Sequence, residues 1–313
     1  MGNARVLKEG AMLLAIFFIM LGVAVFVPFT SIIIQFVFIL PFVLFSARHP
    51  MKYLIPFFVI TFIVSFFIGS YIGMTIAFLY GVTGLVMGYG IQKRESKGNI
   101  YIASSIAFLF GLLLLLIVAA MIFHLNFIDE YQQMFKDTVD QYMDALASLG
   151  QTPSMEIQEQ LINMGNLIGS MAPTILAGAA FVTVLILMAV NFPIVRRLGV
   201  TVPKFKAFRH VNFPKAIVWV YLVVLLFSFF ITEDSSSFFQ MVILNATFLL
   251  QILLVIQGLS FVFYFAHMKK WVKIIPIFVV ILTIMLPFLL SIISVLGIID
   301  IGFSLRQRIN NKV

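Results

Sequence analysis

The residues of this chain that are best suited to hold a ligand are uncharged polar side chains inside long apolar segments. The segment 238–266 is the richest in them. On a helix with 100° per residue, four of its positions fall within an arc of about 40°: Gln240, Thr247, Gln251 and Gly258. Burying an amide without a hydrogen bond is costly. This face therefore looks either onto neighbouring helices or into a cavity for a neutral or amphipathic small molecule.

We expect five residues to line or support such a cavity. One lies near the middle of another apolar segment, 29–47, and the other four belong to 238–266. The candidate substrate-binding residues are Gln35, Asn245, Thr247, Gln251 and Gln257. Hydrogen bonding between helices is the alternative role for the same amides and hydroxyls.

The sequence carries no motif for catalysis. It lacks the GxxxxGK[ST] phosphate loop, the HExxH metal motif and the GxSxG nucleophile elbow. It has no cysteine, which excludes thiolate metal sites and cysteine nucleophiles. No Asp, Glu, Lys or Arg lies well inside an apolar segment, which argues against a proton-coupled pump or a voltage sensor. We expect no enzyme activity, no cofactor and no metal site.

Composition points to the membrane as the solvent of this chain. Of 313 residues, 62% are hydrophobic and only 10% are charged, and the mean hydropathy is +1.14. A soluble domain carries roughly 25% charged residues, because its surface must be solvated. Helices satisfy their own backbone hydrogen bonds in lipid. The composition therefore predicts an all-α polytopic transmembrane helix bundle.

Apolar runs long enough to cross a bilayer, roughly 17–25 residues each, recur along the chain. We place them at 10–28, 29–47, 52–69, 71–91, 100–124, 171–192, 215–232 and 238–266. A final block, 271–304, is expected to split at Pro287 into two short passes. This predicts about ten spans, or nine if the final block crosses once. Uncharged hairpins are expected at 27–30 and 69–71.

The positions of the charges predict the topology. Of the 20 Lys and Arg, 19 lie at the two ends of the chain or in connections that would share one side of the membrane. The connection 125–170 holds seven acidic residues against one basic residue, Lys136. The positive-inside rule therefore places both termini in the cytoplasm and 125–170 outside.

Three parts follow from this arrangement. They are an N-terminal five-span bundle over 1–124, an acidic extracytoplasmic helical hairpin over 125–170, and a C-terminal bundle of four or five spans over 171–313. Apolar residues at three- and four-residue steps predict the two amphipathic helices of the hairpin. The hairpin either packs over the outer mouth of the bundle or acts as a lid over a substrate entrance.

Two kinds of residue could dock a partner. Small residues spaced by four let helix backbones approach closely, and the cytoplasmic connection 193–215 alternates basic and aromatic residues. The candidate docking residues are Ala11, Ala15, Gly84, Gly88, Arg196, Arg197, Lys204, Lys206 and Arg209. Packing within the bundle and contact with anionic membrane lipids are the alternatives, and we expect no nucleic-acid binding.

Several short motifs extend over nearly the whole chain: Glu9-Gly10-Ala11, Ala47-Arg48-His49, Gly84-Leu-Val-Met-Gly88-Tyr, Arg197-Leu-Gly-Val-Thr-Val-Pro203, Gln257-Gly258-Leu259 and Gly297-Ile-Ile-Asp300. In these motifs the chain resembles the YybS-like family of bacterial membrane proteins, which is grouped as a domain of unknown function. The resemblance implies a multi-pass protein of the bacterial plasma membrane.

That family looks distantly similar to the S-components of energy-coupling-factor transporters, which capture micronutrients and dock on a membrane coupling protein with two ATPases. The resemblance implies a small-molecule-binding, transporter-like subunit, with Ala11 and Ala15 as its docking face. The chain departs from the usual six spans of S-components by about four more and by the outer hairpin. The alternative is a non-transporting membrane scaffold or sensor that binds a cytoplasmic or extracytoplasmic partner.

Overall fold

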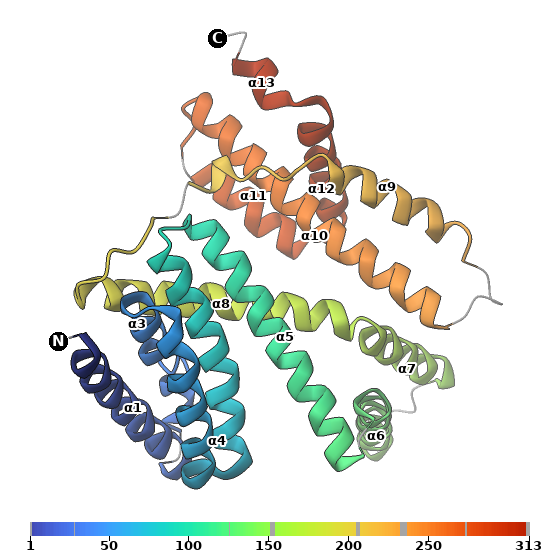
Figure 1. Cartoon of the computed structure of the whole chain (residues 1–313). Coiled ribbons are helices and arrows are strands. Elements are labelled where there is room, and N and C mark those ends of the chain that lie inside the picture. The colour runs from blue at the N-terminus through green and yellow to red at the C-terminus, as the bar shows by residue number, and fades with distance from the viewer. Residues whose placement is uncertain are drawn as a thin grey trace. The chain divides into compact units, whose positions relative to one another are not determined.

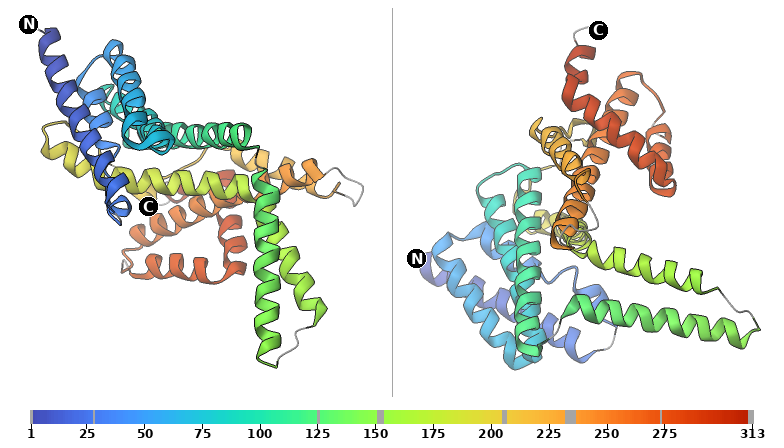
Figure 2. Two further views of the ribbon diagram at one scale, coloured as in Figure 1. Left: turned by 90° about the horizontal axis from the view of Figure 1, so that it is seen from below. Right: turned by 90° about the vertical axis from the view of Figure 1, so that its right-hand side faces the viewer.

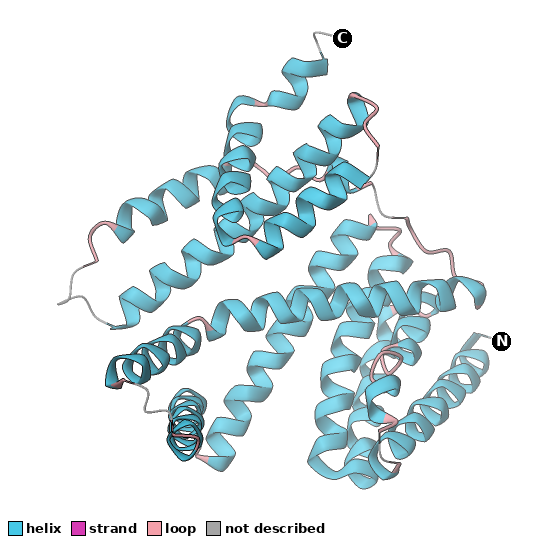
Figure 3. Cartoon of the chain, turned by 180° about the vertical axis from the view of Figure 1, so that it is seen from behind, coloured by secondary structure: helices cyan, strands magenta, loops and turns pink. Residues whose placement is uncertain are grey.

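The computed structural model describes residues 2–27, 29–124, 126–150, 154–204, 207–231, 237–272 and 274–310. Over these residues the chain folds into helices joined by turns and loops, without a strand (Figure 3). The expected all-α class is confirmed. The chain divides into two compact units, one made of 1–130 and 176–205 and the other of 131–175 and 206–313.

Unit 1 contains six helices and a short 3₁₀ turn within the described residues (Figure 1): α1 (Gly2–Phe26), α2 (Ser31–Ile34), α3 (Leu40–Arg48), η1 (Met51–Tyr53), α4 (Leu54–Gln92), α5 (Lys97–Phe123) and most of α8 (Ala172–Arg197). Unit 2 contains most of α6 (Phe127–Ser148), then α7 (Met155–Ser170), η2 (Phe208–His210), α9 (Ala216–Ser228), α10 (Ser237–Met268), α11 (Ile274–Met285), α12 (Pro287–Phe303) and α13 (Leu305–Asn310).

Five of the described helical segments are long and apolar enough to cross a membrane. They are Ala4–Phe26, Met51–Gln92, Lys97–Phe123, Ala172–Arg197 and Phe238–Met268. Three further apolar helices, α9, α11 and α12, are shorter. The number of spans and their orientation stay predictions.

The hairpin expected at 69–71 is present inside α4. Gly69 and Ser70 leave the helical conformation, and Ser70 has a positive φ of 52°. The two arms on either side of this break pack together, since the rings of Phe62 and Phe78 lie 6.3 Å apart. A Cβ atom on Gly73 would lie 2.3 Å from the carbonyl oxygen of Ser65, so the arms approach at backbone distance there.

The expected split of the final block is also present. The helix α11 ends at Met285, Leu286 is extended, and Pro287 begins α12. Proline suits the first turn of a helix because its missing N–H would have no partner there. The block 271–304 therefore forms two helices, as Pro287 predicts.

The segment 29–47, by contrast, is not one continuous helix. It consists of α2 and α3 separated by turns over 35–39. The physical cause is Pro41, because a proline ring clashes with the carbonyl group four residues earlier and cannot donate the helical hydrogen bond. Asn191 on α8 binds one of the carbonyl groups exposed by these turns, since its Nδ2 donates to the carbonyl oxygen of Phe36 at 2.7 Å.

The core of unit 1 is built around phenylalanine and one face of α8. The ring centroids of Phe17 and Phe42 lie 5.0 Å apart, and Phe45 stacks on Phe57 at 4.0 Å. The face of α8 that joins this core is formed by Ala180, Val184, Leu187, Met188, Phe192 and Val195, all of them buried. Segment 176–205 therefore belongs to unit 1, whereas the sequence grouped it with the bundle 171–313.

The expected amphipathic hairpin is formed by α6 and α7, which lie side by side in both views of Figure 2. Their contact depends on small residues, because a Cβ atom on Gly165 would lie 2.2 Å from the ring of Phe135. The Nε2 of Gln158 also donates to Asp140 at 2.9 Å. The apolar residues at three- and four-residue steps on α7 include Met164 and Ile168. Both are exposed, so this part of the apolar face does not lie in the contact with α6.

The core of unit 2 depends on a close crossing of α10 and α12. A Cβ atom on Gly258 would lie 2.1 Å from the carbonyl oxygen of Ile293, and one on Gly297 would lie 2.1 Å from that of Leu254. Two helix backbones reach such contact only where neither residue has a side chain. The polar residues of α10 are positioned by this crossing.

Replacing Gly297 with Ala should therefore destabilise the protein by about 1–3 kcal/mol, the usual cost of overpacking. Gly302 lies on the same helix with open space around it. Its replacement by Ala should leave stability unchanged or raise it slightly. The test is the thermal unfolding temperature of each variant in detergent, and equal temperatures for the two would show that the crossing is not tight.

Candidate functional site

The most elaborate polar site in unit 2 surrounds Asp300, whose side chain is 1% exposed. Its Oδ2 atom accepts hydrogen bonds from Nε2 of Gln257 at 2.6 Å and from Nε of Arg306 at 2.9 Å. The Nη2 of Arg306 lies 2.9 Å from the same oxygen. A buried carboxylate needs this pairing, because an isolated charge inside a protein is strongly unfavourable.

Arg306 reaches Asp300 because the helix is interrupted between them. Ser304 ends α12 in the left-handed conformation, with φ 49° and ψ 47°, and α13 starts at the next residue. The remaining donors of Arg306 bind carbonyl oxygens of Arg209 and Val211, both at 2.9 Å, and the hydroxyl of Ser260 at 3.1 Å. These contacts together match all five donors of a guanidinium group.

Gln257 connects the same cluster to the connection that precedes α9. Its Oε1 accepts from the backbone N–H of Phe213 at 3.0 Å, and its Nε2 also donates to Asn212 at 3.1 Å. The Ser260 hydroxyl lies 2.8 Å from the carbonyl oxygen of Phe208. The cluster therefore fastens residues 208–213 and α13 to α10 and α12, and we call it the Asp300 latch: Asn212, Gln257, Ser260, Asp300 and Arg306.

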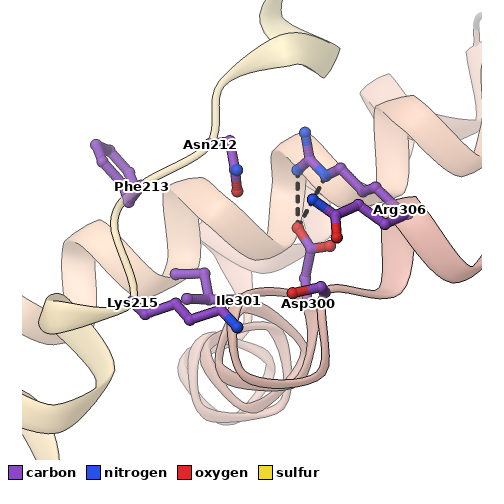
Figure 4. A pocket seen from close by; sticks show the side chains of 8 residues that line it. Asn212, Phe213, Lys215, Asp300, Ile301 and Arg306 are labelled. Carbon is purple, nitrogen blue, oxygen red and sulfur yellow. Dashed lines mark hydrogen bonds and ion pairs between the residues drawn. The ribbon is translucent and has the colours of Figure 1, made fainter.

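A small hollow of about 130 Å³ opens beside the Asp300 latch. Figure 4 shows Asp300 and Arg306 pointing toward one another at its edge, with Lys215 and Ile301 on the other side of the carboxylate. Pockets for metabolite-sized ligands usually measure about 300–1,000 Å³. The arrangement suits a structural clamp better than a substrate pocket.

Asn245, a predicted substrate-binding residue, has a different set of partners. Its Oδ1 accepts from the backbone N–H of Thr174 at 3.0 Å and from the Thr174 hydroxyl at 2.7 Å. Its Nδ2 donates to carbonyl oxygens of Ser170 and Met241 at 2.7 and 2.8 Å. The amide thus holds the junction of α7 and α8 against α10.

The other predicted substrate-binding residues have a local backbone partner or none within the described residues. Gln35 lies in unit 1, where its Nε2 donates to the carbonyl oxygen of Ile32 at 3.1 Å. The Thr247 hydroxyl bonds to the carbonyl oxygen of Ile243 at 2.7 Å within α10. Gln251 is half-buried and forms no hydrogen bond within the described part of the chain.

The residues predicted to dock a partner fall into three groups. Gly84 and Gly88 are covered by α3 of the same chain, since Cβ atoms there would lie 2.6 Å from Phe42 and 2.4 Å from the carbonyl oxygen of Val43. Ala11 and Ala15 are exposed, as are Arg196, Arg197 and Lys204. The carbonyl group of Arg209 belongs to the contacts of Arg306, and Lys206 lies outside the described residues.

Sequence reasoning did not assign Asp300 or Arg306 to a site. Asp300 lies near the end of the expected block 271–304, and the structure encloses it within α12, three residues before that helix ends. The available signal was the pairing of a lone acid with a basic residue six positions later. That spacing exceeds the three- or four-residue steps of one helix, so it becomes a contact only through the break at Ser304.

Unit 1 has a second charged cluster, where α1, α3 and α4 meet. Glu9 forms an ion pair with Arg48, and its other oxygen lies 3.1 Å from Nε2 of His49. The Nη2 of Arg48 donates to the carbonyl oxygen of Leu198, and Gln92 donates to that of His49 at 2.8 Å. Within the described residues, no group of three or more His, Asp or Glu side chains is arranged to hold a metal ion.

Long apolar helices with large exposed side chains, stabilised by buried amides and ion pairs, define an integral membrane protein of the helical class. Its apolar helices are in contact with membrane lipids. Residues 15–301 match the family described as "Predicted membrane protein (DUF2232)", so the chain belongs to that family.

A curated relative aligns with this chain over nearly its whole length. The chain is 28% identical to the "Uncharacterized protein YybS" of Bacillus subtilis (strain 168) over 310 residues, which cover 99% of this chain and 100% of the relative. The expected YybS-like membership is confirmed. No solved structure matches the chain.

Breaking the Asp300 latch should destabilise unit 2. Replacing Arg306 with Gln leaves the Asp300 carboxylate buried without its ion pair, which costs about 3–5 kcal/mol. Arg308 is exposed on the same helix and serves as the matched control. Thermal unfolding in detergent should show a large drop for R306Q and none for R308Q, and a small effect of R306Q would mean that the latch is not structural.

Proposed function

We propose that this chain is a non-enzymatic, small-molecule-binding subunit of membrane transport, of the S-component kind, whose ligand contacts Gln251 on α10. The observation that carries the proposal is the amide of Gln251. It is half-buried in an apolar helix and makes no hydrogen bond within the described part of the chain.

An amide in that position needs partners from elsewhere. Leaving it unpaired in hydrocarbon costs about 1–3 kcal/mol by mutational measures. Its neighbours Leu254 and Val255 are buried, so this part of α10 is not simply surrounded by lipid. A bound small molecule with hydrogen-bonding groups would supply the partners, and the apolar surroundings suit a neutral or amphipathic one.

Gln251 differs in its hydrogen bonding from two other amides on α10, Asn245 and Gln257. Asn245 and Gln257 are fully engaged with protein groups, and they fix the helix to its neighbours on both sides of Gln251. A binding group is most effective when rigid neighbours hold it in place. In this proposal Asn245 and Gln257 support the site and Gln251 contacts the ligand.

A scaffold or sensor is the second candidate, and the exposed basic residues at the end of α8 favour it. Arg197 and Lys204 are exposed and form no ion pair within the described residues. The exposed Ala11 and Ala15 fit either candidate. In the first they leave one face of α1 open for a helix of a coupling protein with ATPases, and in the second for another membrane partner. In the second candidate, a partner's helix would bond to Gln251.

The two candidates differ in what replacement of Gln251 by Leu removes. A ligand-binding role predicts that purified Q251L loses a small molecule retained by the parent protein, with unchanged unfolding temperature. Denaturing extraction followed by mass spectrometry of small molecules provides the measurement. Gln251→Asn keeps an amide and should retain part of the binding, and Ile252→Leu, on the exposed side of α10, should retain all of it.

Loss of a protein partner from Q251L, with no small molecule in the parent preparation, would contradict the ligand-binding role and support the scaffold. A drop in the unfolding temperature of Q251L comparable to that of Gln257→Leu would contradict both, because Gln251 would then be a structural residue like Gln257.

A further inference from the structure

We propose that the charged hollow at the N-terminal end of α1 binds the phosphate of an anionic lipid headgroup. The hollow has a volume of about 530 Å³ and is lined by Arg5, Glu9, Arg48 and His49. This volume falls within the range of ligand-binding pockets, roughly 300–1,000 Å³. The site lies in unit 1 and is independent of Gln251.

The charges of the lining favour an anion. Arg5 and Arg48 contribute two positive charges and Glu9 one negative charge, which leaves +1 when His49 is neutral. Glu9 is already committed, because it pairs with Arg48 and contacts His49. Arg5 forms no ion pair within the described residues and is exposed. The group that would gain most from an incoming anion is therefore the Arg5 guanidinium.

Arg48 is positioned but not saturated. Two of its nitrogens are held, one by Glu9 and one by the carbonyl oxygen of Leu198. A guanidinium has five donors, so three of them have no partner in the described structure. Arg306 in unit 2, by contrast, uses all of its donors on protein groups. Of these two arginines, Arg48 is the one with donors left to bind a phosphate.

The site lies where lipid headgroups are expected. The apolar part of α1 begins directly after Glu9, and the apolar helix α3 ends at Arg48. Lys52 and Tyr53 follow, with the ammonium group 4.8 Å from the ring centroid. Basic and aromatic residues at the ends of apolar helices are typical of the membrane interface, and guanidinium groups pair with phosphate oxygens in two parallel hydrogen bonds.

Titration of the purified full chain with short-chain phosphatidylglycerol, followed by native mass spectrometry, tests the proposal. Arg5→Gln should lower the affinity about tenfold, since hydrogen bonds between charged groups are among the strongest in proteins. Arg5→Lys should keep most of the binding. Lys8→Gln is the matched control, because Lys8 is exposed on the same helix and does not line the hollow.

Three results would overturn the proposal. Equal affinities of R5Q and K8Q would show that the attraction is unspecific and does not involve the hollow. Equal binding of phosphatidylcholine, which has no net charge, would remove the requirement for an anion. Equally tight binding of glycerol phosphate to the same site would mean that the natural ligand is a soluble phosphate ester and not a lipid.

Discussion

In a protein whose helices lie in hydrocarbon, each polar group must be paired by the protein or by something that it binds. This constraint decides where the amides and charges of this chain lie. Asp300 is tolerated inside α12 because Arg306 and Gln257 reach the same oxygen. The Nδ2 of Asn191 in α8 donates to the Phe36 carbonyl group, which the break before α3 leaves without a helical partner. The polar residues of the apolar helices therefore mostly form hydrogen bonds that hold chain segments together.

Hydrogen-bond pairing also distinguishes polar groups with a structural role from groups that can still bind a ligand. Asn245 and Gln257 form hydrogen bonds with the ends and connections of neighbouring helices. Gln251 lies between them on α10 without a partner in the described structure. The two charged clusters differ in the same respect. All donors of Arg306 bind protein groups, whereas Arg48 lines an open hollow and has donors without a partner in the described structure. A ligand-binding residue is expected where rigid neighbours hold a polar side chain that still has hydrogen-bonding groups without a partner.

Much of the fold was predictable from local signals. Pro287 predicted the break between α11 and α12, and the uncharged segment 69–71 predicted the hairpin in α4. Pro41 carried an equally clear signal for the break after α2, but the continuous hydropathy of 29–47 concealed it. The site was harder to predict, because hydropathy finds amides in a helix and not their partners. The contact of Asp300 with Arg306 depends on the left-handed break at Ser304. The grouping of α8 with unit 1 depends on packing between distant segments.

The central claim is that Gln251 faces a space open to a small molecule and not lipid. The chain has no cysteine, so single cysteines can be introduced at positions 251 and 252 and labelled without background. A thiol reacts as its thiolate, which forms only where water reaches it. In intact membranes, a small methanethiosulfonate reagent should modify Q251C readily and leave I252C, on the exposed side of α10, almost unmodified. Equal resistance of both positions would place Gln251 against lipid or a tightly packed helix, and would contradict the account.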